Sequence, residues 1–333
     1  MKKKQKSLYI GDSPIKYVMR FYIPLMIALS DANAENWFCS SYINTKVKKN
    51  NESWMIYQNH NPFVIRFPFP FFSSTLLTKT TLQKKIQWLI EHGYYISVFL
   101  DFYYLKGSIY YLKKHYFHSV LLYGYDFSES KKIFLSGYCF GTKIKAVEMS
   151  YNDLADAFFA CRKNKTWIYK KRKVKKKKFD MRFFYLGIKN YLFSSCSFAY
   201  QFKSRSFSIP FLEIYGIKAH SQLKSDLMNS PVSNCERITI RICSYCELTK
   251  AMIKRLKYIE DNKMLIETSD IKELFLQLLF KYEHMLNLII KFRITGNYGL
   301  INKIITLEED AYKQEEIAYE RLYSLLKEQW GYK

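Results

Sequence analysis

His118 is the residue in this sequence whose surroundings most favour chemistry. It begins the segment His118-Ser-Val-Leu-Leu-Tyr-Gly-Tyr-Asp126, where an apolar run follows the imidazole. Such a run predicts a buried strand, which would hold the ring in a fixed direction. A histidine held this way can act as a general base if a neighbouring strand offers a carboxylate or amide to its other nitrogen. The alternative is a structural histidine at a strand end, hydrogen-bonded and inert.

Cys39 is the candidate nucleophile, because it is the only cysteine that precedes His118 in the chain. A thiol near a helix N-terminus is stabilised as thiolate and would complete a Cys-His-Asp arrangement. Cys39 lies directly after Trp37 and Phe38, and a lone cysteine beside aromatic residues is also typical of a small buried apolar side chain. Both interpretations stay open at this point.

The acid of such a site is missing from the predicted hairpin. The strand that begins at His118 and the segment Lys132–Ser136 are joined by a short polar turn, which predicts a β-hairpin. The residues opposite His118 are then Gly137, Tyr138 and Cys139, none of which carries a carboxylate or amide. Loss of the orienting partner can lower a rate by orders of magnitude. Cys139 would face His118, but a thiol in mid-strand lacks activation by a helix dipole.

The remaining chemical motifs are weak. Cys243 and Cys246 form a lone C-x2-C, and structural zinc usually requires four ligands, so we expect core thiols and no metal site. His60, His92, His220 and His284 show no ligand spacing. No P-loop, G-x-G-x-x-G, G-x-S-x-G or H-E-x-x-H motif occurs, and no cofactor is expected.

The first half of the chain predicts the mixed helices and strands that would position His118. Helical spacing runs over residues 81–92 and ends at Gly93, and an aromatic, β-branched strand follows over 94–104. After the hairpin, Ser150 and Asp153 predict a capped helix that reaches about Arg162. An α+β domain over residues 1–162 is therefore expected.

A basic segment follows this domain. Eleven of the 17 residues over 162–178 are Lys or Arg, and such a run usually forms a solvated loop. We expect a linker over 163–178. Trp167 and Tyr169 lie within the run, and basic–aromatic interleaving can bind single strands, but no RNA- or DNA-binding signature accompanies it, so nucleic acid is not expected as a partner.

The C-terminal region, 179–333, is expected to be mostly helical. Its predicted helices span 234–261, from a cap at Ser269 to Gly296, and from a capping box at Thr306 and Glu309 to Trp330. Their apolar stripes predict a packed helical core.

Charge and composition indicate the cellular compartment and the kind of partner to expect. The net charge is +24, and residues 1–232 carry 37 of the 53 basic but only 14 of the 29 acidic side chains. Seven thinly spread cysteines favour a reducing cytoplasm. No apolar run reaches the roughly 18 residues that span a bilayer. The run Phe21–Leu29 is short and contains Pro24, which disfavours a signal peptide.

Several segments in order resemble the butirosin biosynthesis protein H N-terminal domain family. The segments are Trp37, Gly93-Tyr-Tyr95, Asp101-Phe-Tyr-Tyr104, Lys113-Lys-His-Tyr-Phe-His118, Leu121-Leu-Tyr-Gly-Tyr-Asp126, Ser150-Tyr-Asn-Asp-Leu-Ala-Asp-Ala157, Tyr215-Gly-Ile217 and Cys246-Glu-Leu-Thr-Lys250. The resemblance covers nearly the whole chain. It implies a papain-like fold with an antiparallel sheet, related to C39-type peptidases and found beside nonribosomal-peptide and other natural-product genes.

The resemblance also implies roles for individual positions. His118 matches the family's histidine. The family's cysteine would fall at Tyr22-Ile23-Pro24, and its acid at Gly137, so this sequence departs from the pattern at both. Cys39 would supply the nucleophile only if the first helix is registered differently.

Three hypotheses follow. The first is an acyltransferase of antibiotic-type biosynthesis that moves an acyl group from a carrier-protein thioester to a small-molecule amine or peptide, with Cys39 as nucleophile and His118 as base. The second is an accessory or binding protein of the same pathway that has lost catalysis. The third is a C39-like cysteine peptidase. The basic first half would suit an acidic acyl-carrier or peptidyl-carrier protein as partner.

Overall fold

The structure, a computed structural model, describes residues 4–16, 19–41, 43, 45–48, 54–56, 61–68, 77–137, 144–161, 166–175, 178–195, 213–229 and 231–331. The chain is a mixed α+β protein that divides into two compact units. Unit 1 comprises Met1–Ala34 and Asn61–Lys176, and unit 2 comprises Glu35–His60 and Lys177–Lys333. The expected boundary near residue 162 does not coincide with this division, because Glu35 and Asn36, near the start of the inserted stretch, contact Lys254 and Tyr258 of the C-terminal region.

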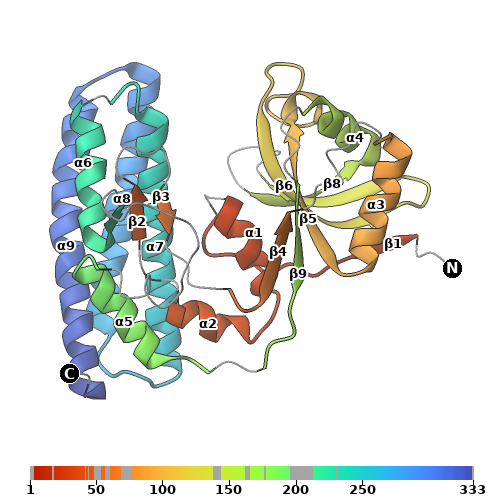
Figure 1. Cartoon of the computed structure of the whole chain (residues 1–333). Coiled ribbons are helices and arrows are strands. Elements are labelled where there is room, and N and C mark those ends of the chain that lie inside the picture. Colours follow the sequence, from red (N-terminus) through yellow and green to blue (C-terminus); the bar gives the residue numbers. More distant parts are fainter. Residues whose placement is uncertain are drawn as a thin grey trace. The chain divides into compact units, whose positions relative to one another are not determined.

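Unit 1 is built on an antiparallel sheet with the order β4-β9-β5-β6-β7-β8. Strand β1 pairs with the C-terminal end of β6. Its strands are β1 (Gln5–Ser7), β4 (Val64–Pro68), β5 (Tyr94–Asp101), β6 (Phe117–Asp126), β7 (Lys132–Gly137), β8 (Lys145–Ser150) and β9 (Trp167–Lys171). Its helices are α1 (Met19–Ala28), α3 (Lys79–Glu91) and α4 (Tyr151–Ala160), with the short 3-10 turn η2 (Phe102–Tyr104) after β5. Helices α3 and α4 cover one face of the sheet, and α1 lies on the other (Figure 1).

The core of unit 1 follows from the alternation of side chains along β5 and β6. The apolar residues Ile96, Val98 and Leu100 of β5 pair with Leu122, Val120 and His118 of β6, so they share one face of the sheet. The apolar members of this set are buried against α3 and α4 in one hydrophobic cluster. Each buried aliphatic side chain contributes about 1.5–3 kcal/mol through the hydrophobic effect. The predicted hairpin of β6 and β7 is confirmed.

The two helices of this face begin where local sequence predicts. The Thr78 hydroxyl accepts a hydrogen bond from the Thr81 amide, and the Thr81 hydroxyl accepts one from the Thr78 amide, which forms a capping box at the start of α3. The Ser150 hydroxyl accepts the Asn152 amide at the start of α4. Gly93, with φ +78°, follows α3 in the left-handed region.

A strand occupies the middle of the segment expected to be a linker. Trp167–Lys171 form β9, which pairs with both β4 and β5. Ile168 and Tyr169 are buried, while Lys170 remains exposed, so the apolar residues of the run join the sheet and the ammonium groups stay in water. The Arg66 guanidinium also lies 3.5 Å from the centre of the Trp167 ring, a cation–π contact across β4 and β9. Residues 162–165 and 176–177 of the run lie outside the described residues.

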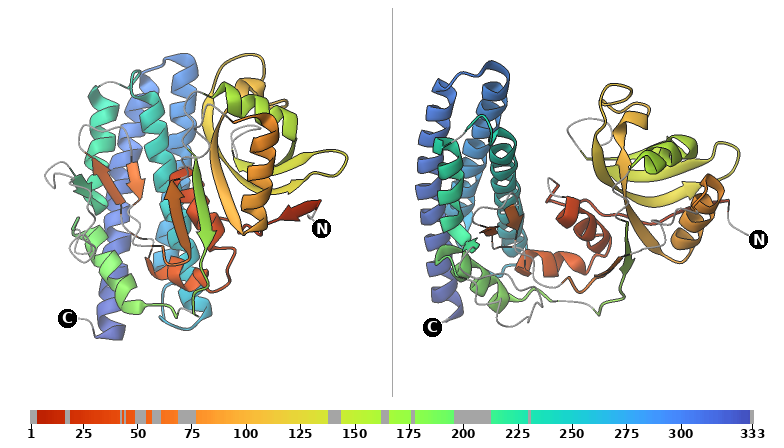
Figure 2. Two further views of the ribbon diagram at one scale, coloured as in Figure 1. Left: turned by 45° about the vertical axis from the view of Figure 1, so that its right-hand side comes forward. Right: turned by 45° about the horizontal axis from the view of Figure 1, so that its top comes forward.

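Unit 2 is dominated by helices, and α7, α8 and α9 run side by side in both views of Figure 2. Its helices are α2 (Ala34–Ser41, of which all but Ala34 belong to this unit), α5 (Met181–Leu192), the 3-10 turn η4 (Gly216–Ala219), α6 (His220–Asn229), α7 (Cys235–Asp261), α8 (Ser269–Thr295) and α9 (Gly299–Trp330). A small antiparallel sheet has the order β10-β2-β3, formed by β10 (Glu213–Tyr215), β2 (Thr45–Lys48) and β3 (Trp54–Ile56). None of the described helices combines the length and the apolar character needed to cross a bilayer.

The start of α9 differs from the predicted capping box at Thr306. The helix begins at Gly299, and the Thr306 hydroxyl donates to the carbonyl of Asn302 within it. Leu300, Ile301 and Ile304 are buried against the other helices, so packing extends the helix by two turns beyond the local signal.

Gly216 lies where the chain approaches α5 most closely. Its φ is +56°, and a methyl group added there would overlap the backbone carbonyl oxygen of Tyr191. Gly296, after α8, has a similar φ of +66° but nothing within 4 Å. Substitutions at these two glycines therefore distinguish the cost of backbone strain, present at both, from the cost of steric overlap, present only at Gly216.

Gly216→Ala is expected to destabilise unit 2 more than Gly296→Ala does. Both alanines carry the left-handed strain of about 1–2 kcal/mol, but only Gly216→Ala adds overpacking of about 1–3 kcal/mol. Urea unfolding of the two variants measures the difference. Equal losses would show that the close approach to Tyr191 carries no cost.

Candidate functional site

Cys39 lies in a setting that keeps its thiol neutral. It occupies the second half of α2, where the helix dipole disfavours a thiolate, and its side chain is fully buried. Burial raises its pKa to about 11, although the nearby charges of Arg255 and Lys254 act in the opposite direction. The described surroundings resemble a packed core, with the Arg255 guanidinium 4.9 Å from the centre of the Phe38 ring.

His118 is held by aromatic rings on the α3 and α4 face of the sheet. It is the second residue of β6 and pairs with Leu100 of β5. Its Nδ1 lies 3.0 Å from the carbonyl oxygen of Ser119, and its ring lies 6.1 Å from that of Phe102 and 5.8 Å from that of Tyr116. Burial lowers the pKa of His118, and the hydrogen bond to Ser119 only partly opposes this shift. The imidazole is therefore neutral near pH 7.

Tyr22 begins the stretch Tyr22-Ile23-Pro24, in which the family resemblance places the nucleophile. The Tyr22 hydroxyl, from α1, lies 2.9 Å from the hydroxyl of Ser136 on β7, and both side chains are buried. Ser136 pairs with Leu121, which is three residues from His118 along β6. Because successive side chains alternate between faces, Leu121 and His118 point to opposite sides of the sheet. Helix α1 and Tyr22 therefore face away from the His118 ring.

The structure does not bring the predicted pair together within one unit. Cys39 belongs to unit 2 and His118 to unit 1. Gly137 ends β7 and pairs with Lys145, so the described part of this hairpin offers no acid to His118. Tyr138 and Cys139 lie outside the described residues. A Cys39–His118 pair stays a prediction, and the burial of the Cys39 thiol does not favour it.

Two residues of unit 1 form a pair that sequence reasoning missed. The Asp101 carboxylate, at the end of β5, lies 2.6 Å from Nδ1 of His115 and is 1% exposed. His115 stands three residues before His118, and its side chain is 57% exposed. The pairing of β5 with β6 explains the contact. Asp101 pairs with Phe117, so the end of β5 and the start of β6 bring the carboxylate and the imidazole together.

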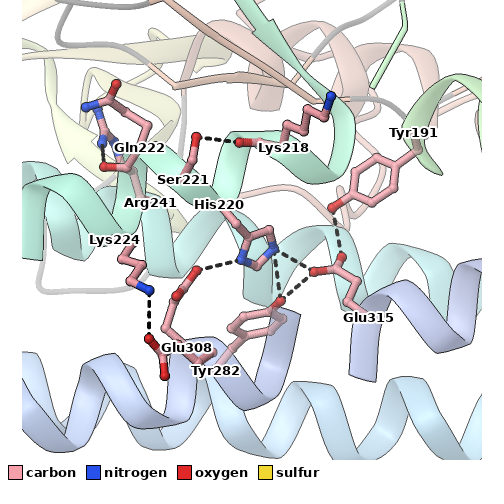
Figure 3. A network of polar contacts seen from close by, with 11 residues as sticks. Tyr191, Lys218, His220, Ser221, Gln222, Lys224, Arg241, Tyr282, Glu308 and Glu315 are labelled. Carbon is pink, nitrogen blue, oxygen red and sulfur yellow. Dashed lines mark hydrogen bonds and ion pairs between the residues drawn. The ribbon is translucent and has the colours of Figure 1, made fainter. Parts of the chain in front are cut away.

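The most extensive buried polar cluster in the described residues lies in unit 2 (Figure 3). His220 of α6 is placed between two glutamates of α9, with Nδ1 3.0 Å from Glu308 Oε1 and Nε2 2.8 Å from Glu315 Oε2. The Tyr282 hydroxyl donates to Glu315 Oε2 at 2.6 Å, and the Tyr191 hydroxyl donates to Glu315 Oε1 at 2.8 Å. His220, Glu308 and Glu315 are each no more than 3% exposed.

The two glutamates of this cluster keep His220 charged. Burial alone would lower the pKa of His220, but its hydrogen bonds to Glu308 and Glu315 and their negative charges raise it to about 9. The ring is therefore an imidazolium at neutral pH that donates from both nitrogens. Burial raises the pKa of Tyr282 well above its usual value, as does the negative charge of Glu315, so its hydroxyl stays a donor. This arrangement is suited to fixing helices together and not to proton transfer with solvent.

A sequence signal for this cluster existed. Glu308 and Glu315 fall on the same stripe of α9 as the buried residues Ile304, Ala311 and Ala318, at spacings of three and four. An acid on an apolar stripe needs a buried partner. The position of His220 could not be predicted from local pattern, because it comes from a different helix.

Metal binding has no support in the described residues. No group of three or more His, Cys, Asp or Glu side chains there has an arrangement that could hold an ion. Cys243 and Cys246 are buried in α7, and burial raises the pKa of Cys246 to about 12.

No family model matches this chain, and no curated protein matches it.

Cys39 is expected to react slowly with iodoacetamide near neutral pH. A pKa of about 11 in place of 9.0 lowers the thiolate fraction by about a hundredfold, and burial restricts access further. Peptide mapping by mass spectrometry, with free N-acetylcysteine as reference, measures the rate. Fast alkylation of Cys39 that slows in His118→Ala would contradict the burial and support a thiolate–imidazole pair.

The free energy of unfolding is expected to fall as pH rises from 6.5 to 9. The folded pKa of His220 is raised from 6.5 to about 9, so its stabilisation is complete below 6.5 and is lost through 9. The shift corresponds to roughly 3 kcal/mol. His220→Gln should remove this slope and also destabilise unit 2, since two buried carboxylates lose their cation.

Lys224→Gln is the matched control, because Lys224 of α6 pairs with Glu309 of α9 at the exposed surface. It should keep the wild-type slope and cost much less stability than His220→Gln does, because solvent screens an exposed ion pair. Denaturant unfolding at several pH values compares the three proteins. The same slope in His220→Gln as in wild type would exclude His220 as its origin.

Proposed function

We propose that this chain is an accessory protein of natural-product biosynthesis, in which a papain-like domain has lost cysteine catalysis and is kept for binding. The pathway rests on the sequence resemblance to the butirosin biosynthesis protein H N-terminal domain family. The antiparallel sheet with α1 on one face is consistent with a papain-like domain. A reducing cytoplasm is the proposed setting, because the seven cysteines are thinly spread along the chain.

The observation that carries the proposal is the hydrogen bond between Tyr22 and Ser136. The stretch Tyr22-Ile23-Pro24, where the resemblance places a thiol, has none, and its Tyr22 phenol has a pKa that burial raises. A buried neutral phenol is a poor nucleophile, and the His118 ring lies on the opposite face of the sheet, where it cannot take the phenol's proton.

Cysteine-dependent acyl transfer and C39-like peptidase activity have less support. Both need a thiolate beside an imidazole. Cys39, the nucleophile candidate, has a raised pKa and no solvent exposure.

The partner we propose is an acidic acyl-carrier or peptidyl-carrier protein. Unit 1 carries many exposed lysines that would steer such a protein by charge. The exposed lysines of this unit include Lys106, Lys113, Lys114, Lys145 and Lys170. Binding of this kind weakens as salt screens the surface charges.

An acyl thioester probe separates binding from catalysis. After incubation with an octanoyl N-acetylcysteamine thioester, we expect intact-mass spectrometry to show no acyl adduct on the wild type or on Cys39→Ser. A Cys39 adduct that forms more slowly in His118→Ala would replace this proposal with the acyltransferase.

Carrier binding is tested separately. Fluorescence anisotropy with a labelled acyl carrier protein should show binding at low ionic strength that weakens with salt. Cys39→Ser and the matched variant Cys161→Ser, another buried thiol, should bind equally. Failure to bind at low salt would contradict the accessory role.

A further inference from the structure

The loop between β5 and β6 is folded around the carboxylate of Asp101. Oδ1 accepts hydrogen bonds from the amides of Tyr103 at 3.1 Å and Tyr116 at 3.3 Å. Oδ2 lies 2.6 Å from Nδ1 of His115. The carboxylate is therefore fixed by the backbone at both ends of the loop, and its remaining oxygen is aimed at the imidazole.

His115 presents its other nitrogen to solvent. Because the Asp101 carboxylate accepts from Nδ1, the neutral ring carries its lone pair on Nε2. No described residue forms a hydrogen bond with Nε2, and the side chain is 57% exposed. The ring is stacked on Tyr103 at 4.4 Å between centres, so its direction is fixed by packing as well as by the carboxylate. An imidazole oriented in this way by a buried aspartate is the base half of a hydrolytic triad.

Two further aromatic rings lie beside the base, with Tyr104 6.2 Å and Phe117 6.4 Å from the His115 ring between centres. Tyr104, Ile109, Leu112 and Phe117 are 37%, 52%, 61% and 39% exposed, and all come from this loop or the first residue of β6. Leu112 has φ 52°, in the left-handed region that is strained for residues other than glycine. Strain of this kind persists where the surrounding structure enforces it, often at functional loops. An exposed base among apolar side chains fits a small apolar ester.

We propose that Asp101 and His115 form an acid–base site that hydrolyses small apolar esters without a cysteine. Nε2 of His115 takes a proton from water as the water oxygen bonds to the ester carbonyl carbon. The bond from that carbon to the alcohol oxygen then breaks, and the alcohol leaves with the proton from Nε2. His115 is the catalytic residue and Asp101 a positioning residue. This activity goes beyond the accessory role and needs neither Cys39 nor His118.

His92 is a matched control within unit 1. Its Nδ1 lies 2.7 Å from the carbonyl oxygen of Trp88, and its ring is stacked on that of Trp88 at 4.2 Å. It is therefore an exposed, stacked, Nδ1-bonded histidine like His115, but its partner is a carbonyl and no carboxylate contacts it among the described residues. Any ester cleavage common to surface imidazoles should be the same at both positions.

Hydrolysis of p-nitrophenyl butyrate tests the site. We expect His115→Gln to lose roughly a hundredfold in kcat/KM, which is typical of removing a general base, and His92→Gln to retain wild-type activity. Equal losses in the two variants, or a wild-type rate no greater than that of free imidazole at the same concentration, would overturn the proposal. Circular dichroism confirms that each variant is folded.

Asp101→Asn separates positioning from loop structure. The amide oxygen can still accept the Tyr103 and Tyr116 amides, but its NH₂ group would donate to Nδ1 and shift the ring proton to Nε2. We expect at least a tenfold loss of rate and a changed pH profile, in a setting whose other charged or titratable neighbours are Tyr103, Tyr104, Lys113 and Lys114. Long-range proton–nitrogen NMR should find the His115 proton on Nδ1 in the wild type and on Nε2 in Asp101→Asn. An unchanged tautomer and rate would contradict the role of Asp101.

Discussion

The pairing of β5 with β6 decides which side chains of unit 1 can do chemistry. With Leu100 opposite His118 and Asp101 opposite Phe117, the register turns His118 toward Phe102 and the α3 and α4 core. A shift of one residue would turn it toward α1 instead. The buried apolar residues that alternate along both strands make such a shift costly. Core packing therefore determines which face of the sheet His118 occupies.

Burial disfavours the charged form of both Cys39 and His220, but only His220 has counter-charges that keep it ionised. No hydrogen bond from a charged group to Cys39 is among its described contacts, so desolvation raises its pKa and keeps the thiol protonated and unreactive. His220 is equally buried, but Glu308 and Glu315 contact both its nitrogens and keep it charged. The first group packs as an apolar side chain, while the second joins α6 to α9. In neither case does residue type alone indicate the outcome.

Much of the fold could be predicted from local pattern. The hairpin of β6 and β7, the start of α4 at Ser150 and the extent of α7 follow from alternation, capping and helical spacing. Strand β9 could not be predicted, because its charge run is typical of a loop and only pairing with β4 and β5 makes it a strand. The first turns of α9 were missed for a similar reason, since Leu300 and Ile301 are ordered by packing and not by a cap.

The sequence by itself determined the mixed α+β class and the helical C-terminal region. Only the tertiary structure decided that His118 faces an aromatic core, that Cys39 is sealed from solvent and that His115 meets Asp101. The physical reason is that spacing along a chain sets the period of an element and the identity of its side chains. Which face of a sheet a side chain occupies, and whether a charge or a hydrocarbon surrounds it, depends on strands and helices contributed by distant parts of the chain.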